Sequence, residues 1–298
     1  MASAPPDRAA PWLGVSAYVL WGLLPLYLKL LKDVPALQVL SHRVVWSLLL
    51  LGVIVVALGR LRGIAAAARG RTLLLLVASA SLIAVNWLVY IWAVQNGHVL
   101  EASLGYFINP LVNVALGVAV LGERVSRVQK VAVAVAAVGV VVMAVAGGGA
   151  ILISLTLALS FGTYGLIRKV AAIDALGGLT VETLILAPAA LAVLGWAEMH
   201  GQGAWGTDTR LDMLLVLAGA VTAAPLLLFA VAARRMKYTT LGLLQYIAPT
   251  LQFAEAVLLF GEPLRWVHLV TFALIWGGCA LYASDSLRSA RRVPATAS

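Results

Sequence analysis

The longest uncharged stretch of this chain places the strongest constraint on its fold. No charged residue occurs between Val131 and Ile167, a stretch of 37 residues. As one helix, with a rise of about 1.5 Å per residue, it would be about 55 Å long. That is too long for one crossing of a hydrocarbon layer about 30 Å thick. The glycine run at 147–149 favours a break, so the stretch predicts two consecutive membrane-spanning helices.

Apolar runs of similar length recur along the chain. Hydrophobic residues make up 62% of the 298 residues and charged residues only 11%, whereas roughly 25% of residues are charged in a soluble domain. Since a span needs about 20 mostly apolar residues, we predict an all-α membrane protein with ten transmembrane helices. Their approximate ranges are 11–31, 36–59, 72–95, 101–122, 128–146, 150–168, 178–197, 212–233, 240–260 and 266–284.

The orientation follows from lysine and arginine, which concentrate in cytoplasmic loops. With the N-terminus inside, 16 of the 21 such residues fall in inner segments. Arg43 lies within a span, and the four in outer loops are Lys29, Lys32, Arg210 and Arg265. Both termini are therefore predicted to be cytoplasmic, in a multi-pass protein. The net charge of +9 comes from short clusters without a basic-aromatic platform, so we expect a lipid bilayer and no nucleic acid as partner.

An internal repeat relates the two halves of the chain. Residues 84–144 align without gaps with residues 223–283, at a constant offset of 139. The most informative matches are Pro110 with Pro249, the Gly-Glu pair at 122–123 with that at 261–262, and Gly139 with Gly278. Five spans per half would thread the second half in the opposite direction. We therefore predict two inverted five-helix repeats, residues 1–149 and 150–298.

Paired proline-interrupted helices point to the binding site in inverted-repeat transporters, near the middle of the membrane. Pro110 and Pro249 form such a pair and are interpreted as kinks that line a cavity; prolines that only bend their helices are the alternative. This architecture also suggests a mechanism, because two halves that exchange conformations open a central site to either side in turn.

Amide side chains accompany both prolines. Asn109 and Asn113 share one face of the fourth helix, and Gln245 and Gln252 flank Pro249 on the ninth. Such amides can bind a substrate or join helices. We favour cavity lining.

Aromatic residues add to this candidate site. Asn86 and Tyr90 lie on a broad face of the third helix, while Tyr106 and Tyr246 precede the two prolines. Aromatic rings can stack on a planar or cationic ligand. Packing and anchoring at the membrane interface are the alternative roles.

Charged and titratable groups inside a membrane are costly and therefore candidates for function. Arg43 can anchor an anion or carboxylate through its guanidinium, pair with a carboxylate, or reach the outer surface. The neighbouring His42 can carry a coupling proton or pack as a neutral ring.

Three glutamates are candidates for coupling or ion pairing. Glu101 opens the fourth helix, where a carboxylate complements the helix N-terminus, and it can also pair with Arg43 or Lys29. Glu182 lies near the inner end of the seventh span, and Glu255 lies deeper in the ninth. Either can carry a proton or pair with a cation, and a lipid-facing or interface position is a further alternative for Glu255.

Structural roles are expected elsewhere. Glu123 and Glu262 follow matched glycines, and we expect them to pair with a nearby cation such as Arg124 or Arg265. Small residues fill the fifth and tenth spans, which either brace each bundle or form a homodimer contact. Cys279 is the only cysteine and is expected to pack in an apolar run.

Several runs resemble those of RarD proteins, a branch of the EamA-domain drug/metabolite transporter superfamily. They are EASLGYFINP at 101–110, TLGLLQYIAPT at 240–250, YVLWG at 18–22, HR at 42–43 and YGLIRK at 164–169. The resemblance extends from about residue 12 to 284. It implies a bacterial inner-membrane permease of ten helices in two EamA repeats. The family label, "chloramphenicol-sensitive protein", names a phenotype and implies no substrate.

Motifs of other classes are absent from the sequence. It has no P-loop, dinucleotide fingerprint, HExxH, GxSxG or Cys/His metal cluster, so we expect no cofactor, no metal and no ATP-driven transport. We therefore predict a secondary transporter of a small molecule rather than an enzyme. The alternatives are a non-transporting scaffold subunit and, less favoured, a membrane-embedded enzyme.

Overall fold

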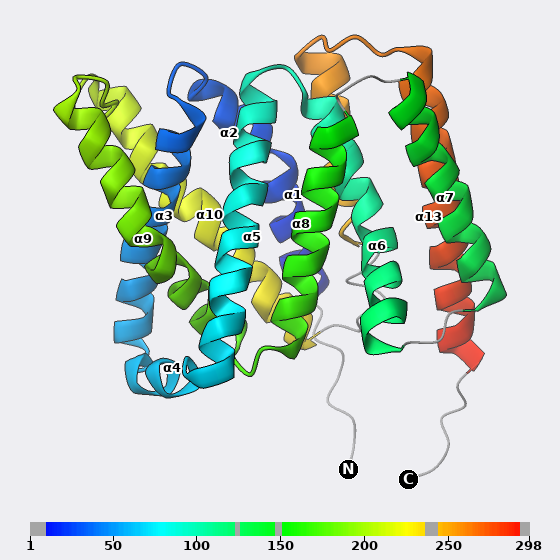
Figure 1. Ribbon diagram of the computed structural model, residues 1–298, viewed down its shortest axis with the longest axis horizontal. Helices are drawn as coiled ribbons and strands as arrows, with labels where there is room; N and C mark the ends of the chain where they lie inside the picture. Colours follow the sequence, from blue (N-terminus) through cyan, green and yellow to red (C-terminus); the bar gives the residue numbers. More distant parts are fainter. Residues whose placement is uncertain (1–9, 123–125, 147–150, 236–243, 293–298) are drawn as a thin grey trace.

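A computed structural model describes residues 10–122, 126–146, 151–235 and 244–292, which form helices and turns without a strand (Figure 1). Nine helices of these segments are long and apolar enough to cross a membrane, and a shorter apolar one covers Ile247–Leu259. The elements are α1 (Ala10–Gly22), α2 (Leu24–Leu30), α3 (Ala36–Ala57), α4 (Leu61–Ala67), α5 (Gly70–Gln95), α6 (Val99–Leu121), α7 (Arg127–Ala146), α8 (Ile151–Val170), α9 (Ala175–Met199), α10 (Thr209–Arg235), α12 (Ile247–Ala254), the π-helix η2 (Glu255–Leu259) and α13 (Trp266–Arg292).

The predicted all-helical class and pattern of spans are confirmed, with two refinements. The first span consists of α1 and α2, and Pro25 lies at the start of α2, where its missing N–H costs nothing. The ninth span consists of α12 and η2; its predicted start at 240 lies outside the described residues. The uncharged stretch is divided as predicted, since α7 ends at Ala146 and α8 begins at Ile151. The glycine run itself lies outside the described residues.

The two halves run through the molecule in opposite directions. In Figure 1, α1 rises from the lower side, whereas its counterpart α8 descends. Likewise α3 descends, whereas its counterpart α9 rises. The start of α1 and the end of α13 lie on the same side, as an even number of crossings requires. The inverted repeat is thus visible in the direction of the helices.

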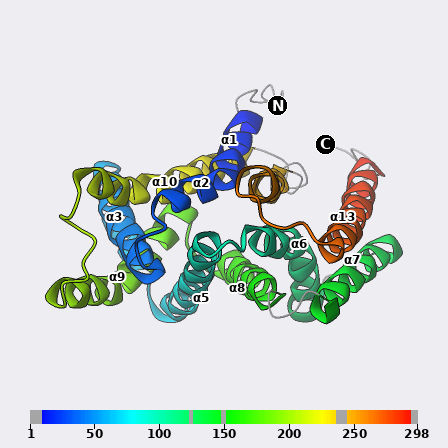
Figure 2. The same ribbon diagram turned by 90° about the horizontal axis from the view of Figure 1, so that it is seen from above.

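Packing between the halves follows the same symmetry. The equivalent helices α3 and α9 pack together, and so do α7 and α13. The contact of α1 with α10 has its counterpart in that of α8 with α5, and the contact of α1 with α12 in that of α8 with α6. Figure 2 shows α7 and α13 as a pair at one end of the molecule, with α3 and α9 at the other. Most of the tertiary structure is therefore an interface between the repeats.

Repeat-matched glycines permit the close contact of α7 with α13. A Cβ added at Gly278 would lie 2.7 Å from the carbonyl oxygen of Ala132, and one at Gly139 would lie 3.1 Å from that of Thr271. The Thr271 hydroxyl donates to the Gly139 carbonyl oxygen at 3.2 Å. Small residues thus brace these two helices within one chain, as in other membrane helix pairs.

We expect Gly278→Ala to lower the free energy of unfolding by about 1–2 kcal/mol, because overpacking forces the helices apart. The adjacent Gly277 offers a matched control, since a Cβ added there meets nothing within 4 Å. Reversible unfolding in mixed micelles measures both variants. Equal costs for Gly278→Ala and Gly277→Ala would contradict this account of the interface.

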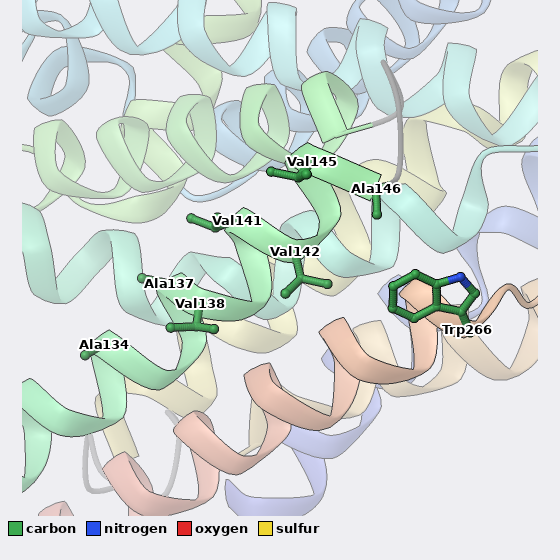
Figure 3. Close-up of a pocket in the computed structure, with 8 residues that line it drawn as sticks. All are labelled: Ala134, Ala137, Val138, Val141, Val142, Val145, Ala146 and Trp266. Atoms are coloured by element: carbon green, nitrogen blue, oxygen red, sulfur yellow. The ribbon is translucent and has the colours of Figure 1, made fainter.

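The outer surface of the α7–α13 pair carries an apolar groove of about 620 Å³. Figure 3 shows its side chains along α7, with Trp266 of α13 at one end. The groove is lined by Ala134, Ala137, Val138, Val141, Val142, Val145, Ala146 and Trp266. A surface of this composition suits lipid chains, which offer no partner to polar groups.

Glu262 has a role that the sequence analysis missed. Its carboxylate accepts hydrogen bonds from the backbone N–H groups of Val99 and Leu100, each at 2.8 Å. These groups open α6, so a residue of the second repeat caps a helix of the first, where the helix dipole favours a negative charge. Burial raises the pKa of Glu262, although the two backbone hydrogen bonds oppose this shift. The expected pairing of Glu262 with Arg265 is not found, and Glu123 lies outside the described residues.

Gly261, which precedes Glu262, allows the chain to turn toward α6. Gly261 has φ +65°, and its repeat partner Gly122, which ends α6, has φ +66°. Only glycine adopts this left-handed conformation without strain. The matched glycines therefore end the fourth and ninth spans in the same way, and the turn after Gly261 directs Glu262 toward α6.

We expect Glu262→Ala to lower the free energy of unfolding by about 1–2 kcal/mol, because two buried N–H groups lose their acceptor. Glu262→Gln keeps one acceptor oxygen and should lie between wild type and Glu262→Ala. Hydrogen exchange at the start of α6 provides the local measurement. Unchanged protection of the Val99 and Leu100 amides in Glu262→Ala would show that the cap is dispensable.

Candidate functional site

Arg43 is buried at the interface between the repeats. It lies on α3, which packs against α9 and α10 of the second half, and only 3% of its surface is exposed. Its Nε donates to the hydroxyl of Thr222 on α10 at 3.0 Å. The guanidinium lies 5.0 Å from the ring centroid of Trp87 on α5, a cation–π contact.

The guanidinium of Arg43 retains unused bonding capacity. Its Nη1 has no hydrogen-bond partner among the residues that the structure describes. In the described part of the chain, none of the ion pairs within 4 Å involves Arg43. The predicted alternatives of a carboxylate pair and of an exposed head group are therefore not found there. Since a buried charge without a counter-charge is costly, this arrangement calls for a ligand or water.

Aromatic and amide groups surround this charge. The phenols of Tyr90 and Tyr106 lie close enough to Arg43 for electrostatic interaction, and their rings pack edge to face. The Tyr106 hydroxyl donates to Asn86 Oδ1 at 3.2 Å. Asn86 in turn donates to Ser160 of α8 at 3.0 Å and thereby ties three helices together. Tyr90 is 2% exposed, and its hydroxyl has no hydrogen-bond partner within the described segments.

A second polar group lies where α6 meets α12 and η2. Asn109, Gln252 and Glu255 are all buried there, and each has an acceptor oxygen without a hydrogen-bond donor. Gln252 Nε2 donates to the backbone oxygen of Trp21. Glu255 begins the π-helix η2, a local distortion that is frequent at functional sites. Tyr90 is close enough to interact electrostatically with both Arg43 and Glu255.

We call these residues the central polar cluster. It takes side chains from α3, α5, α6, α10, α12 and η2, and thus from both repeats. Its members are Arg43, Asn86, Trp87, Tyr90, Tyr106, Asn109, Thr222, Gln252 and Glu255. Pro110 and Pro249 lie within α6 and α12, directly beside this cluster in sequence.

Other predicted site residues lie at the edge of the cluster or outside it. The His42 ring stacks on Trp205, in the turn between α9 and α10. Asn113 is exposed, and Gln245 is half-buried. Tyr246 stacks on Phe107, with ring centroids 6.2 Å apart.

The two remaining glutamates have their partners away from Arg43. Glu101 lies in the first turn of α6, near His98 at 3.5 Å and His268 at 4.0 Å. The pairing of Glu101 with Arg43 or Lys29 is therefore not observed. Glu182 is 1% exposed and pairs with Arg168 at 3.8 Å.

Polar links between the halves lie on both sides of the central polar cluster. On the side of the α9–α10 turn, Gln38 donates to the Gln202 carbonyl oxygen at 2.9 Å and accepts from the Ala204 N–H. On the opposite side, Arg60 pairs with Asp174 at 2.8 Å. This hydrogen bond and the charge of Asp174 raise the pKa of Arg60.

Sequence reasoning missed two hydroxyl groups of this arrangement. Thr222 holds Arg43, and Ser79 donates to the Glu182 carboxylate. Each lies in an otherwise apolar span, where a side-chain hydroxyl can donate to the backbone carbonyl oxygen one turn earlier in the same helix. In the sequence, each is marked only as a polar residue within an apolar run, which is a weak indication of a polar partner on another helix.

Opposed bundles with a polar centre, enclosed by apolar outer surfaces, define a multi-pass membrane protein. The sequence profile described as "EamA-like transporter family" matches residues 9–145 and again residues 148–284. The chain belongs to this family, and within it to the RarD branch, as its relatives show.

Several relatives that carry the RarD name match almost the whole chain. Protein RarD of Streptomyces exfoliatus is 47% identical over 291 residues, which cover 96% of this chain and 91% of that protein. Protein RarD of Escherichia coli is 42% identical over 287 residues, covering 96% and 97%. An uncharacterized transporter of Pseudomonas aeruginosa is 47% identical over 290 residues, 95% of each chain.

A solved structure supports the fold. One crystal structure superposes with a TM-score of 0.62 and covers 97% of this chain and 99% of its own, at 20% sequence identity. The family and the apolar helices identify the chain as a multi-pass inner-membrane transporter of the drug/metabolite superfamily.

Proposed function

We propose that this protein is a secondary transporter that moves a small metabolite or drug across the bacterial inner membrane by alternating access. Its halves, residues 1–149 and 150–298, would rock against each other, with both termini in the cytoplasm. The observation that carries the proposal is the central polar cluster, whose unsatisfied polar groups come from both inverted repeats and are buried between them. Inverted-repeat carriers bind their substrates in this position.

Links on both sides of the cluster support alternating access. Opening toward the α9–α10 turn would break the bonds of Gln38 to the turn. Opening toward the opposite side would break the Arg60–Asp174 pair. Both sets of bonds join the first repeat to the second, so rocking of the halves would exchange one for the other.

Flux measurements test the proposal. An uptake and export screen of metabolites and drugs, with and without the protein, selects candidate solutes, and proteoliposomes then measure their flux. We expect Asn109→Ala to lower this flux about tenfold, the equivalent of one lost hydrogen bond to a bound solute. Asn96→Ala is the control, because Asn96 is exposed and bonds only to Trp92 of its own helix.

The same experiment distinguishes the rival functions. Absence of flux for every candidate solute would contradict the proposal and favour a scaffold subunit. Turnover of a solute by the purified protein in detergent, without flux, would favour a membrane-embedded enzyme.

A further inference from the structure

Buried donors without a hydrogen-bond partner lie on α3 and α5, around Arg43. Arg43 Nη1 and the hydroxyls of Tyr90 and Ser47 are buried and have no hydrogen-bond partner. Ser47 follows Arg43 by one turn of α3, so both lie on the same face of that helix. The unsatisfied oxygens of Asn109, Gln252 and Glu255, on α6, α12 and η2, are acceptors. We call the group on α3 and α5 the donor side of the cluster and the group on α6, α12 and η2 its acceptor side.

We infer that the donor side is a subsite for the carboxylate of a small monocarboxylate solute, with Arg43 as its anchor and Tyr90 as a second donor. This inference rests on the proposed function and names the substrate class of the same site. A bound carboxylate would neutralise Arg43, which has no counter-charge within 4 Å among the described residues. It would also accept from Nη1 and from the Tyr90 hydroxyl.

The environment of the guanidinium favours a carboxylate over other anions. Thr222 occupies Nε and Trp87 covers one face, which leaves the edge that carries the two terminal nitrogens. That edge matches the two oxygens of a carboxylate. A doubly charged phosphate would leave an excess negative charge in a buried site, which is costly.

The acceptor side limits the ligand to one negative charge. Glu255 interacts electrostatically with Tyr90, which also interacts with Arg43. A second anionic group of the solute near Glu255 would meet its carboxylate and the unsatisfied oxygens of Asn109 and Gln252. Hydrogen-bond donors on the distal part of the solute would be favoured there instead.

Binding to the purified full-length protein in detergent tests the subsite independently of transport. The probes are acetate, lactate and benzoate, each compared with its primary amide at equal ionic strength. The readout is the midpoint of thermal unfolding, which rises when a ligand binds only the folded protein. We expect at least one carboxylate to raise the midpoint more than its amide does. If none of the three does so, the inference is wrong.

Substitutions test whether the carboxylate binds at Arg43. Arg43→Gln should weaken carboxylate binding about 10- to 100-fold, which corresponds to the loss of a charged hydrogen-bond donor. Arg71→Gln makes the same substitution at an exposed position near the start of α5 and should leave the preference for the carboxylate unchanged. If Arg43→Gln does not fold, Thr222→Val keeps the charge but removes the acceptor of Nε, and it should also weaken binding. A carboxylate preference that survives both changes would place the anion elsewhere.

Binding and flux separate this inference from the proposed function. Carboxylate binding that depends on Arg43 without flux of any solute would support the subsite and contradict the carrier. Flux of uncharged solutes that is unaffected by Arg43→Gln would support the carrier and contradict the subsite.

Discussion

Replacement of Arg168 by leucine is expected to lower the free energy of unfolding by about 3–5 kcal/mol, the cost of removing one partner of a buried ion pair. Arg168 pairs with Glu182, which is 1% exposed inside a membrane-spanning helix. Ser79 also donates to this carboxylate, and Tyr164 does so at 3.4 Å. Without Arg168 the carboxylate would stay buried with only neutral donors, in a region where charge is strongly disfavoured.

The double variant Arg168→Leu/Glu182→Leu separates charge from packing. Removal of both charges should restore most of the lost free energy of unfolding, because the loss arises from the uncompensated Glu182 carboxylate. Arg71→Leu is the control, since Arg71 is exposed at the start of α5. Reversible unfolding in mixed micelles measures all four proteins. A double variant as unstable as Arg168→Leu would show that the ion pair is not the source of the loss.

The spans could be predicted from the sequence because the length of an apolar run is a local property. The division of the uncharged stretch into α7 and α8 is an example, as is the inverted repeat, which follows from an odd number of spans per half. These arguments need only the bilayer thickness and a count of residues. No knowledge of which helix touches which is required.

The partners of the polar residues could not be predicted because they depend on contacts between distant helices. Arg43 bonds to Thr222, 179 residues away, and Glu262 caps a helix 162 to 163 residues earlier in the chain. Helical spacing identified shared faces, such as that of Asn109 and Asn113, but it did not show that only Asn109 is buried. Spacing limits the direction of a side chain, whereas its partner is set by the packing of the repeats.

The repeat is symmetric in its backbone and asymmetric in its charges. Arg43 and Glu182 are separated by the repeat offset of 139 residues and lie on the equivalent helices α3 and α9. Glu182 has a cationic partner in Arg168, but Arg43 has no anionic partner within 4 Å in the described segments. A carrier needs a symmetric frame to exchange its two conformations, yet one unpaired charge suffices to bind one ligand. The asymmetry therefore supports the proposed subsite, because Glu182 has its counter-charge within the fold and Arg43 has none among the described residues.

Gly219 allows α10 to pack closely against α3 and thereby affects the position of Arg43. A Cβ added at Gly219 would lie 2.6 Å from the backbone carbonyl of Trp46, so α10 and α3 are in backbone contact there. Thr222 follows one turn later on α10 and holds Arg43. We therefore expect Gly219→Val to force the two helices apart, at a cost of about 3 kcal/mol, the upper end of overpacking effects.

The same change should disturb the central polar cluster, since Thr222 would move away from the Arg43 guanidinium. A matched control is Gly195→Val on α9, because Gly195 is exposed and a Cβ added there meets nothing within 4 Å. Unfolding in mixed micelles measures stability, and the fluorescence of Trp87 reports on its contact with Arg43 in a background without the other tryptophans. If Gly219→Val and Gly195→Val lower the free energy of unfolding equally, close contact between α10 and α3 does not hold Arg43 in place.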